Sequence, residues 1–256
     1  MNRVRVTRVG GVGRVTLARP EKKNALDRQM VDEIAQALES LAAETETRVI
    51  LLDAEGDDFC AGADLEALEA LLDADRDAQL DDARALGRVF TTIRQLRLPV
   101  VVAVRGRAFA GGAGLATACD LVLAHPNATF AYPEVRLGFV PAMVMNILRR
   151  VVTERQAFDL AVSGRSLSAA EAEAMGLVSR ILSAEGFDAS VDEVCQSIAK
   201  LPPDAVRRTK KLFYELDGRA FESGIAHGAQ ANAEARMTEE FREGVRKFLQ
   251  RKRGAP

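Results

Sequence analysis

Two short loops of small residues carry the chemistry that stands out in this chain. The first spans residues 59–65 and reads FCAGADL, and the second spans residues 108–115 and reads AFAGGAGL. Each follows an aliphatic run typical of a buried strand, at residues 49–52 and 100–104. Side chains as small as those of Gly and Ala let a ligand contact the backbone, so free N–H groups become the binding chemistry. Two N–H donors that converge on one oxygen would form an oxyanion hole.

A third segment, residues 132–138 (YPEVRLG), supplies a carboxylate. Glu134 has the apolar sequence neighbours Phe130, Tyr132, Leu137 and Phe139. An apolar pocket raises a carboxyl pKa toward neutrality, which suits a group that takes and returns a proton. We therefore expect Glu134 to be an acid–base residue. The alternative is a surface glutamate paired with Arg136.

The two loops and the Glu134 segment together resemble the crotonase superfamily, also known as the enoyl-CoA hydratase/isomerase family. The resemblance runs nearly end to end and includes VTLARP at residues 15–20, KNAL at 23–26, ACDL at 118–121 and AMGLV at 174–178. Members of this family act on acyl-CoA thioesters and hold the thioester oxygen with two backbone N–H groups while an enolate develops. The resemblance implies that Ala63 and Gly111 are the two donors, and that Glu134 moves the proton at the alpha carbon.

The same resemblance indicates how the substrate would be held. It places these residues at substrate-binding or CoA-binding positions: Lys23, Ala61, Gly62, Asp64, Gly112, Gly114 and Arg251. Lys23 and Arg251 would meet the CoA phosphates, although each has the alternative of a simple surface charge. Ala61 would contact adenine through its backbone. No metal or redox cofactor is expected, because CoA arrives as part of the substrate.

One departure from the family pattern affects the reaction. Family hydratases typically carry a second glutamate three residues after the second N–H donor, where it helps to hold the attacking water, and here that position is Gly114. A single glutamate suffices to move a double bond, so the local chemistry favours an isomerase, while related proteins with Gly-Leu at this point are commonly assigned as hydratases. We expect a hydratase, with a delta3-delta2 enoyl-CoA isomerase as the alternative. A second departure, PAMVMN at residues 141–146, either lines an acyl pocket or packs in the core.

The pattern of elements predicts an α/β fold. Strand-like alternation around Gly10-Gly11 predicts a hairpin over residues 3–19, and helical spacing predicts a helix over residues 27–43. Further strands are expected at 121–124 and 129–131, and capping boxes begin helices at Thr153 and Ser168. The repeated units are consistent with a right-handed spiral, and the resemblance implies a crotonase-like spiral of ββα units over residues 1–199. Long charged helices at 204–216 and 221–251 then form a helical region over residues 200–256, which in the family makes trimers or pairs of trimers.

Residues 64–82 hold eight acidic side chains against one base, Arg76. Such a charge run is typical of a solvated helical face with a loop. The alternative is a mobile lid over the acyl end of the substrate, because the segment directly follows the first N–H loop.

The composition of the chain argues against several other classes of function. A net charge of −2 makes nucleic acid and anionic membranes poor partners, and no apolar run is long enough to span a membrane. Three scattered cysteines and two histidines argue for a reduced cytoplasmic location and against multi-histidine metal sites. The open rivals are a hydrolase that uses Cys60 as nucleophile, a CoA-thioester hydrolase that uses Glu134, and an interaction protein such as an RNA-binding crotonase.

Overall fold

The computed structural model describes residues 2–253, with side chains as far as Gln250. Its main sheet has the strand order β1-β2-β3-β4-β6-β9. The first two strands pair antiparallel and form the predicted hairpin, and every later neighbour pairs parallel. The strands are β1 Val4–Val9, β2 Val12–Leu17, β3 Val49–Ala54, β4 Val100–Val104, β6 Leu121–Ala124 and β9 Arg180–Ile181.

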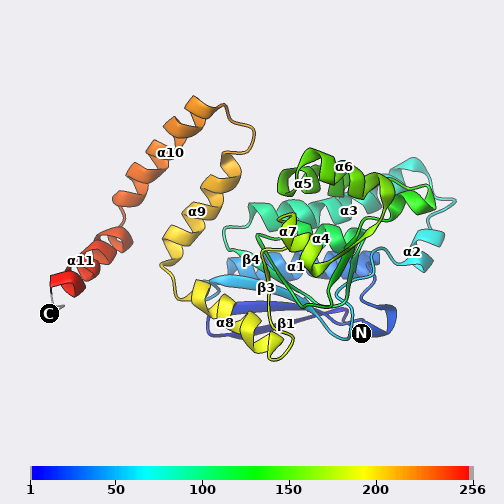
Figure 1. The fold of residues 1–256 in the computed structure, drawn as a ribbon, viewed down its shortest axis with the longest axis horizontal. Helices are drawn as coiled ribbons and strands as arrows, with labels where there is room; N and C mark the ends of the chain where they lie inside the picture. The colour runs from blue at the N-terminus through cyan, green and yellow to red at the C-terminus, as the bar shows by residue number, and fades with distance from the viewer. Residues whose placement is uncertain (1, 254–256) are drawn as a thin grey trace.

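Helices cover both faces of this sheet (Figure 1). On one face lie α1 Arg28–Ala43, α3 Arg76–Gln95 and α4 Gly111–Ala118. On the other face lies α8 Phe187–Ala199, which packs Phe187, Val191 and Cys195 against outward-facing strand residues such as Leu51 and Leu123. Both faces of the central strands β3, β4 and β6 are therefore buried, which explains why their aliphatic runs are continuous rather than alternating.

A second, smaller sheet has the order β5-β7-β8, with bounds β5 Arg107–Phe109, β7 Thr129–Ala131 and β8 Ser166–Ser168. The pair β5–β7 is parallel, and β7–β8 is antiparallel. The second N–H loop leaves β5, and the Glu134 segment leaves β7 through the short 3-10 helix η2 Glu134–Leu137. Both segments therefore emerge at the carboxyl end of one parallel pair.

Three further helices complete the core beyond η2: α5 Ala142–Val151, α6 Glu154–Ser163 and α7 Ala169–Ala174. Thr153 and Ser168 each form the predicted capping box at the start of α6 and α7. The predicted helix over residues 27–43 is also confirmed: Asp27 caps α1 by accepting from the Met30 N–H at 2.9 Å. The α/β architecture expected from the sequence is thus present.

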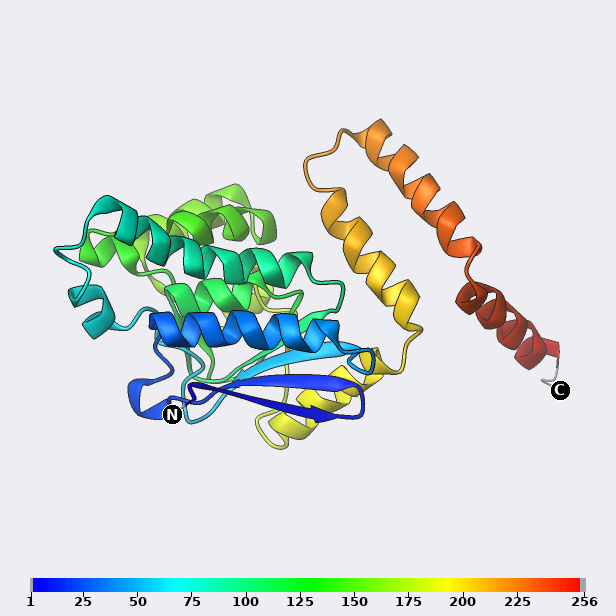
Figure 2. The same ribbon diagram turned by 180° about the vertical axis from the view of Figure 1, so that it is seen from behind.

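The C-terminal helices extend away from the core (Figures 1 and 2). The first of them, α9 Pro203–Glu215, is anchored by Lys210, whose buried Nζ lies 2.7 Å from Asp120 Oδ2 and also donates to the carbonyls of Ile93 and Leu98. Tyr214 donates its hydroxyl to the other oxygen of Asp120 at 2.7 Å. These contacts fix α9 on the core, and α10 and α11 follow it outward.

The single helix predicted over residues 221–251 is wrong. The chain forms α10 Phe221–Arg236 and α11 Glu239–Arg253, with a break at residues 237–238. Thr238 Oγ1 accepts from the Phe241 N–H at 3.2 Å, which is the side-chain capping that begins a new helix. Helical spacing of apolar residues continues across this break, so the periodicity alone did not reveal it.

Candidate active site

Four chain segments run side by side in parallel where the two loops meet. Leu26 bridges to Ala63, Cys60 bridges to Ala108, and Ala108 pairs with Phe130 in the β5–β7 ladder. The carboxyl ends of parallel segments lie at the same edge. Ala63, at the end of its segment, and Gly111 and Glu134, which follow theirs, therefore lie toward the same edge of the layer.

The backbone N–H of Ala63 is left free by the way its segment pairs. The bridge to Leu26 uses the Gly62 carbonyl, which accepts from the Leu26 N–H at 2.7 Å, and the Asp64 N–H, which donates to the Leu26 carbonyl at 2.8 Å. In a parallel bridge the central residue, here Ala63, directs its own N–H away from the partner strand. Within residues 2–253 this amide has no protein acceptor, and Ala63 is exposed.

The second donor, Gly111, is the first residue of α4. The first amides of a helix have no intrahelical acceptor, and within the described chain Gly111 N–H has no other protein acceptor either. The preceding Ala110 has φ 48° and ψ −122°, an uncommon backbone conformation for a residue with a Cβ. The positive end of the helix dipole adds to the attraction for a developing negative charge.

The glycines are required by the close approach of the two loops. A Cβ at Gly112 would lie 2.5 Å from the Cys60 carbonyl oxygen. At Gly62, which has φ +101°, a Cβ would lie 2.9 Å from the Ala110 Cβ and 3.0 Å from the Phe109 carbonyl oxygen. The Ala63 loop therefore packs directly against the Gly111 loop, and the action of the two amides on one oxygen stays a prediction.

Glu134 lies buried at 8% exposure, with Oε2 lacking a hydrogen-bond partner in the described protein. Burial raises the pKa of Glu134, and a hydrogen bond from its own backbone N–H offsets only part of that effect. Phe130 and Tyr132 are buried as expected, but Leu137 and Phe139 are 73% and 63% exposed, so these two do not form the pocket. The alternative of a surface glutamate paired with Arg136 does not hold, because the carboxyl group is buried.

Gly114 sits on α4 with its Cα pressed against apolar side chains. A Cβ there would lie 2.6 Å from Val144 Cγ2 and 2.9 Å from Phe90 Cζ. The space in which a second glutamate side chain would begin is therefore filled by α3 and α5. Gly114 is therefore a position where neighbouring apolar side chains leave no room for a glutamate side chain.

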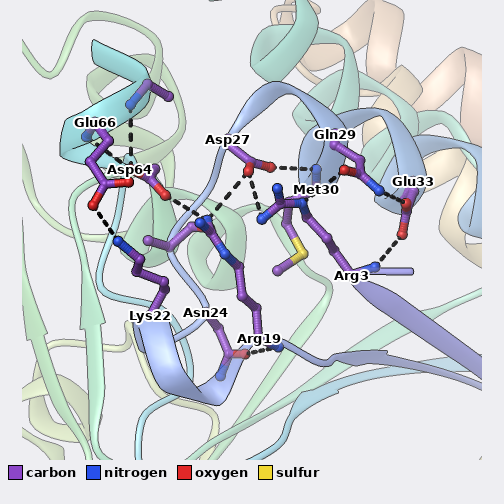
Figure 3. A network of polar contacts seen from close by, with 12 residues as sticks. Arg3, Arg19, Lys22, Asn24, Asp27, Gln29, Met30, Glu33, Asp64 and Glu66 are labelled. Carbon is purple, nitrogen blue, oxygen red and sulfur yellow. Dashed lines mark hydrogen bonds and ion pairs between the residues drawn. The ribbon is translucent and has the colours of Figure 1, made fainter. Parts of the chain in front are cut away.

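The carboxylate of Asp64 makes its contacts within the protein. Its Oδ2 lies 2.6 Å from Arg19 Nη1, and its Oδ1 accepts from the Glu66 N–H at 2.9 Å at the start of α2 Leu65–Glu69 (Figure 3). Burial raises the pKa of Asp64, but the hydrogen bonds from Arg19 and from the Ala67 and Glu66 amides outweigh it, so the pKa lies below its usual range. These contacts fix the residue that follows Ala63.

Arg19 is the functional candidate that the sequence reasoning missed. It lies 12% exposed between Asp64 and Asp27, at 2.6 and 3.3 Å (Figure 3). The available signal was its place in the VTLARP motif at residues 15–20, which is part of the family resemblance. Lys22 also pairs with Glu66 across the same two segments.

The CoA-binding candidates are distributed around this region. The carbonyl of Lys23 accepts from the Ala61 N–H at 3.0 Å, and the Lys23 side chain is exposed. Ala61 is half-buried and its N–H is used in that hydrogen bond, and its contact with adenine stays a prediction. The side chain of Arg251 lies outside the described residues, so its phosphate-binding role stays a prediction.

The acidic segment after the first loop forms α2 and the start of α3. Leu65 and Leu72 are exposed at 68% and 76%, as are most of its charged side chains. A solvated helical face fits this exposure, and a lid role stays a prediction.

Cys60 is fully buried, and burial raises the pKa of its thiol to about 12. A thiolate is the reactive form of cysteine, so this environment disfavours a nucleophilic role. Within residues 2–253 no cluster of three or more His, Cys, Asp or Glu side chains is arranged to hold a metal ion. No helix in the same range has the length and apolarity to cross a membrane.

Comparison with known proteins adds an independent line of observation. Residues 7–255 match the family model described as enoyl-CoA hydratase/isomerase. A putative enoyl-CoA hydratase of Thermus thermophilus is 39% identical over 243 residues, which cover 95% of this chain and 96% of that protein. The 2,3-dehydroadipyl-CoA hydratase of Escherichia coli is 30% identical over 98% of this chain and 97% of its own length. The crystal structure of a putative enoyl-CoA hydratase/isomerase (crotonase) from Legionella pneumophila has a TM-score of 0.92, with 31% identity over 98% of this chain and 97% of that one.

Proposed function

The chain belongs to the enoyl-CoA hydratase/isomerase family, the crotonase superfamily, and from that premise we propose that it adds water across the double bond of a 2-enoyl-CoA thioester. The observation that supports the proposal is the close packing of the Ala63 and Gly111 loops, whose two backbone N–H groups have no acceptor in the described protein, together with the buried carboxyl group of Glu134. The names of the relatives that are hydratases support the same direction.

The two amides would stabilise the charge that forms during the reaction. Addition of a nucleophile to the beta carbon puts negative charge on the thioester oxygen. Fixed N–H donors bind that charge more strongly than they bind the neutral carbonyl of the substrate. One such donor is typically worth about 3 kcal/mol of barrier height. Ala63 and Gly111 supply this without any side chain, which is why the site tolerates only small residues around them.

Glu134 would move the protons. As the carboxylate, it takes a proton from a water molecule whose oxygen attacks the beta carbon. It then returns that proton to the alpha carbon as the enolate collapses, so that one water is added in all. A raised pKa suits both halves of this cycle, because the group must accept a proton and release it again.

A second candidate is the movement of a double bond from the beta–gamma to the alpha–beta position. Here Glu134 would take a proton from the alpha carbon of a 3-enoyl-CoA and return it to the gamma carbon. The observation that favours it is the filled space at Gly114, where Val144 and Phe90 leave no room for a second carboxylate to hold a water. In the hydratase proposal, Glu134 alone must both hold the attacking water and transfer the proton.

The CoA-thioester hydrolase is the remaining enzyme alternative. A cysteine route through Cys60 is disfavoured by its burial and raised pKa. A route through Glu134 would release free CoA, which neither of the other reactions does. The mass of the product therefore separates the three: a gain of one water, no change, or loss of CoA.

We also propose that the protein assembles with copies of itself, as a trimer or a pair of trimers, in the cytoplasm. Support for assembly comes from α10 and α11, which expose Phe221, Ile225 and Phe248 at 80%, 61% and 67%. Apolar side chains gathered on extended helices are typical of an interface. A sedimentation mass of one chain at micromolar concentration would contradict the assembly.

A further inference from the structure

A buried pair of hydroxyl groups joins α4 to the segment that carries Glu134. Thr117 Oγ1 and Tyr132 Oη lie 2.8 Å apart, at 3% and 0% exposure. Thr117 also donates to the carbonyl of Ala113 at 2.6 Å. Because a threonine hydroxyl has one proton, Tyr132 must be the donor in the bond between the two side chains.

A backbone hydrogen bond joins the start of α4 to the same stretch of chain. At the start of α4, the Ala110 N–H donates to the Ala131 carbonyl at 2.9 Å. Thr117 lies seven positions further along, which is about 10 Å of helix at 1.5 Å per residue. The backbone contact holds Ala131, and the hydroxyl contact holds the tip of the next side chain, Tyr132, so the segment is tied to α4 at two points.

The two contacts frame the reacting groups. Gly111, the expected oxyanion donor, is the first residue of α4, and Glu134 follows Tyr132 by two residues through Pro133. Gly164, at the end of α6, closes the other side: a Cβ there would lie 3.0 Å from Pro133 Cα. The segment that leads to Glu134 thus contacts both α4 and the end of α6, and Oε2 of Glu134 has no hydrogen-bond partner in the described protein.

We propose that the Tyr132–Thr117 hydrogen bond is a positioning contact that sets the place of the Glu134 carboxyl group relative to the Gly111 amide. The proposal rests on the proposed function, because it takes Glu134 as the proton carrier. Neither hydroxyl acts on the substrate. Burial raises the pKa of Tyr132, so the phenol keeps its proton and remains a donor.

The test compares Tyr132→Phe with Tyr214→Phe, which changes the only other tyrosine in the chain. Tyr214 also donates its hydroxyl to a carboxylate, that of Asp120, but it is half-buried and lies on α9. We expect kcat for enoyl-CoA turnover to fall about tenfold or more in Tyr132→Phe with KM unchanged, since small displacements of a reacting group cost up to about 100-fold. We expect kcat to stay at the wild-type level in Tyr214→Phe, even where both variants lose similar stability.

Thr117 provides the rescue test. Thr117→Val should lower kcat as Tyr132→Phe does, the double variant should be no worse than either single one, and Thr117→Ser should retain wild-type kcat because it keeps the acceptor. Wild-type kcat in Tyr132→Phe, or an equal loss in Tyr214→Phe, would overturn the proposal.

A second readout separates this proposal from the proposed function. Acetoacetyl-CoA ionises to an enolate with its own ultraviolet absorbance, and its bound enolate fraction depends on the base and the N–H donors without water addition or isomerisation. If the wild type turns over neither enoyl substrate, a lower enolate fraction in Tyr132→Phe and Thr117→Val, but not in Thr117→Ser and Tyr214→Phe, still supports the positioning role. An equal enolate fraction of bound acetoacetyl-CoA in all four variants would refute the positioning role.

Discussion

The amide of Ala110 donates to the carbonyl of Ala131 at 2.9 Å, which ties the start of α4 to the end of β7. Gly111 follows the first of these residues by one position, and Glu134 follows the second by three. The expected oxyanion donor and the expected base are therefore placed by one parallel ladder, β5–β7, whose register pairs Phe109 with Ala131. Because these backbone hydrogen bonds place the two segments, replacement of the Glu134 side chain should alter chemistry more than fold.

Replacement of Glu134 by glutamine should remove turnover and leave binding intact. The amide keeps the shape of the side chain but cannot accept and return a proton, so kcat should fall about 100-fold to 10,000-fold. Acyl-CoA affinity, measured by calorimetry, should stay at the wild-type level. Glu154→Gln, at an exposed position on α6, serves as the control and should retain full kcat. A fully active Glu134→Gln would remove Glu134 from the role of proton carrier.

The raised pKa of Glu134 gives the enzyme a defined acid limit. Catalysis begins with the carboxylate, so kcat/KM should rise with pH through a pKa above the ordinary glutamate value.

The contribution of Glu134 to the free energy of unfolding should fall as the pH rises. A group whose pKa is raised by folding contributes stability below its unfolded pKa and loses it as pH rises through the folded pKa. Urea unfolding should therefore show Glu134→Gln more stable than wild type at neutral pH and equal to it in acid. Equal stability at both pH values would contradict the burial of an unpaired carboxylate.

The packing at Gly114 predicts that no side chain is tolerated there. Gly114→Ala should cost about 1–3 kcal/mol of unfolding free energy, because its Cβ would overlap Val144 and Phe90. The matched control is Gly228→Ala on α10, where nothing lies within 4 Å of a Cβ and the change should be neutral or stabilising. Val144→Ala should restore part of the loss in the Gly114→Ala background. Thermal unfolding of the four proteins measures all three effects.

Arg19 should matter for both fold and catalysis. Removing it in Arg19→Ala leaves the buried carboxylate of Asp64 without its partner, which typically costs about 3 kcal/mol. The same change removes the contact that holds Asp64 next to the Ala63 amide, so kcat should fall as well. Arg28→Ala breaks exposed ion pairs with Asp32 and Asp81 and should cost less than about 1 kcal/mol. An Arg19→Ala variant that matches Arg28→Ala in both stability and kcat would show that the Arg19–Asp64 pair does not support the loop.

Local signals predicted the elements well. The strands at 121–124 and 129–131 have the predicted bounds, and both capping boxes form, because these features depend on residues close together in the chain. The two glycine-rich loops were also expected to lie together, because each follows an aliphatic run typical of a buried strand, and Cys60 and Ala108 of these loops do pair.

Relationships between distant residues were not predictable in the same way. No pattern in the sequence pairs Thr117 with Tyr132, or Arg19 with Asp64, because side-chain partners are chosen by packing in three dimensions. The burial of Glu134 was predicted with partly wrong neighbours: Leu137 and Phe139 point into solvent once η2 turns the chain. Likewise, the sequence shows that Gly114 stands where a second glutamate is usual, but it does not show that Phe90 and Val144 fill the space beside it.

The most direct measurement gives one preparation of the protein trans-2-enoyl-CoA and trans-3-enoyl-CoA in separate reactions, with product masses determined alongside the absorbance of the conjugated thioester. The account predicts loss of conjugation from the 2-enoyl substrate with a gain of one water, abolished in Glu134→Gln. Conjugation that appears only from the 3-enoyl substrate, without a change of mass, would contradict hydration and make the isomerase the correct reading of Gly114. No reaction of either enoyl substrate, with free CoA released instead, would contradict both.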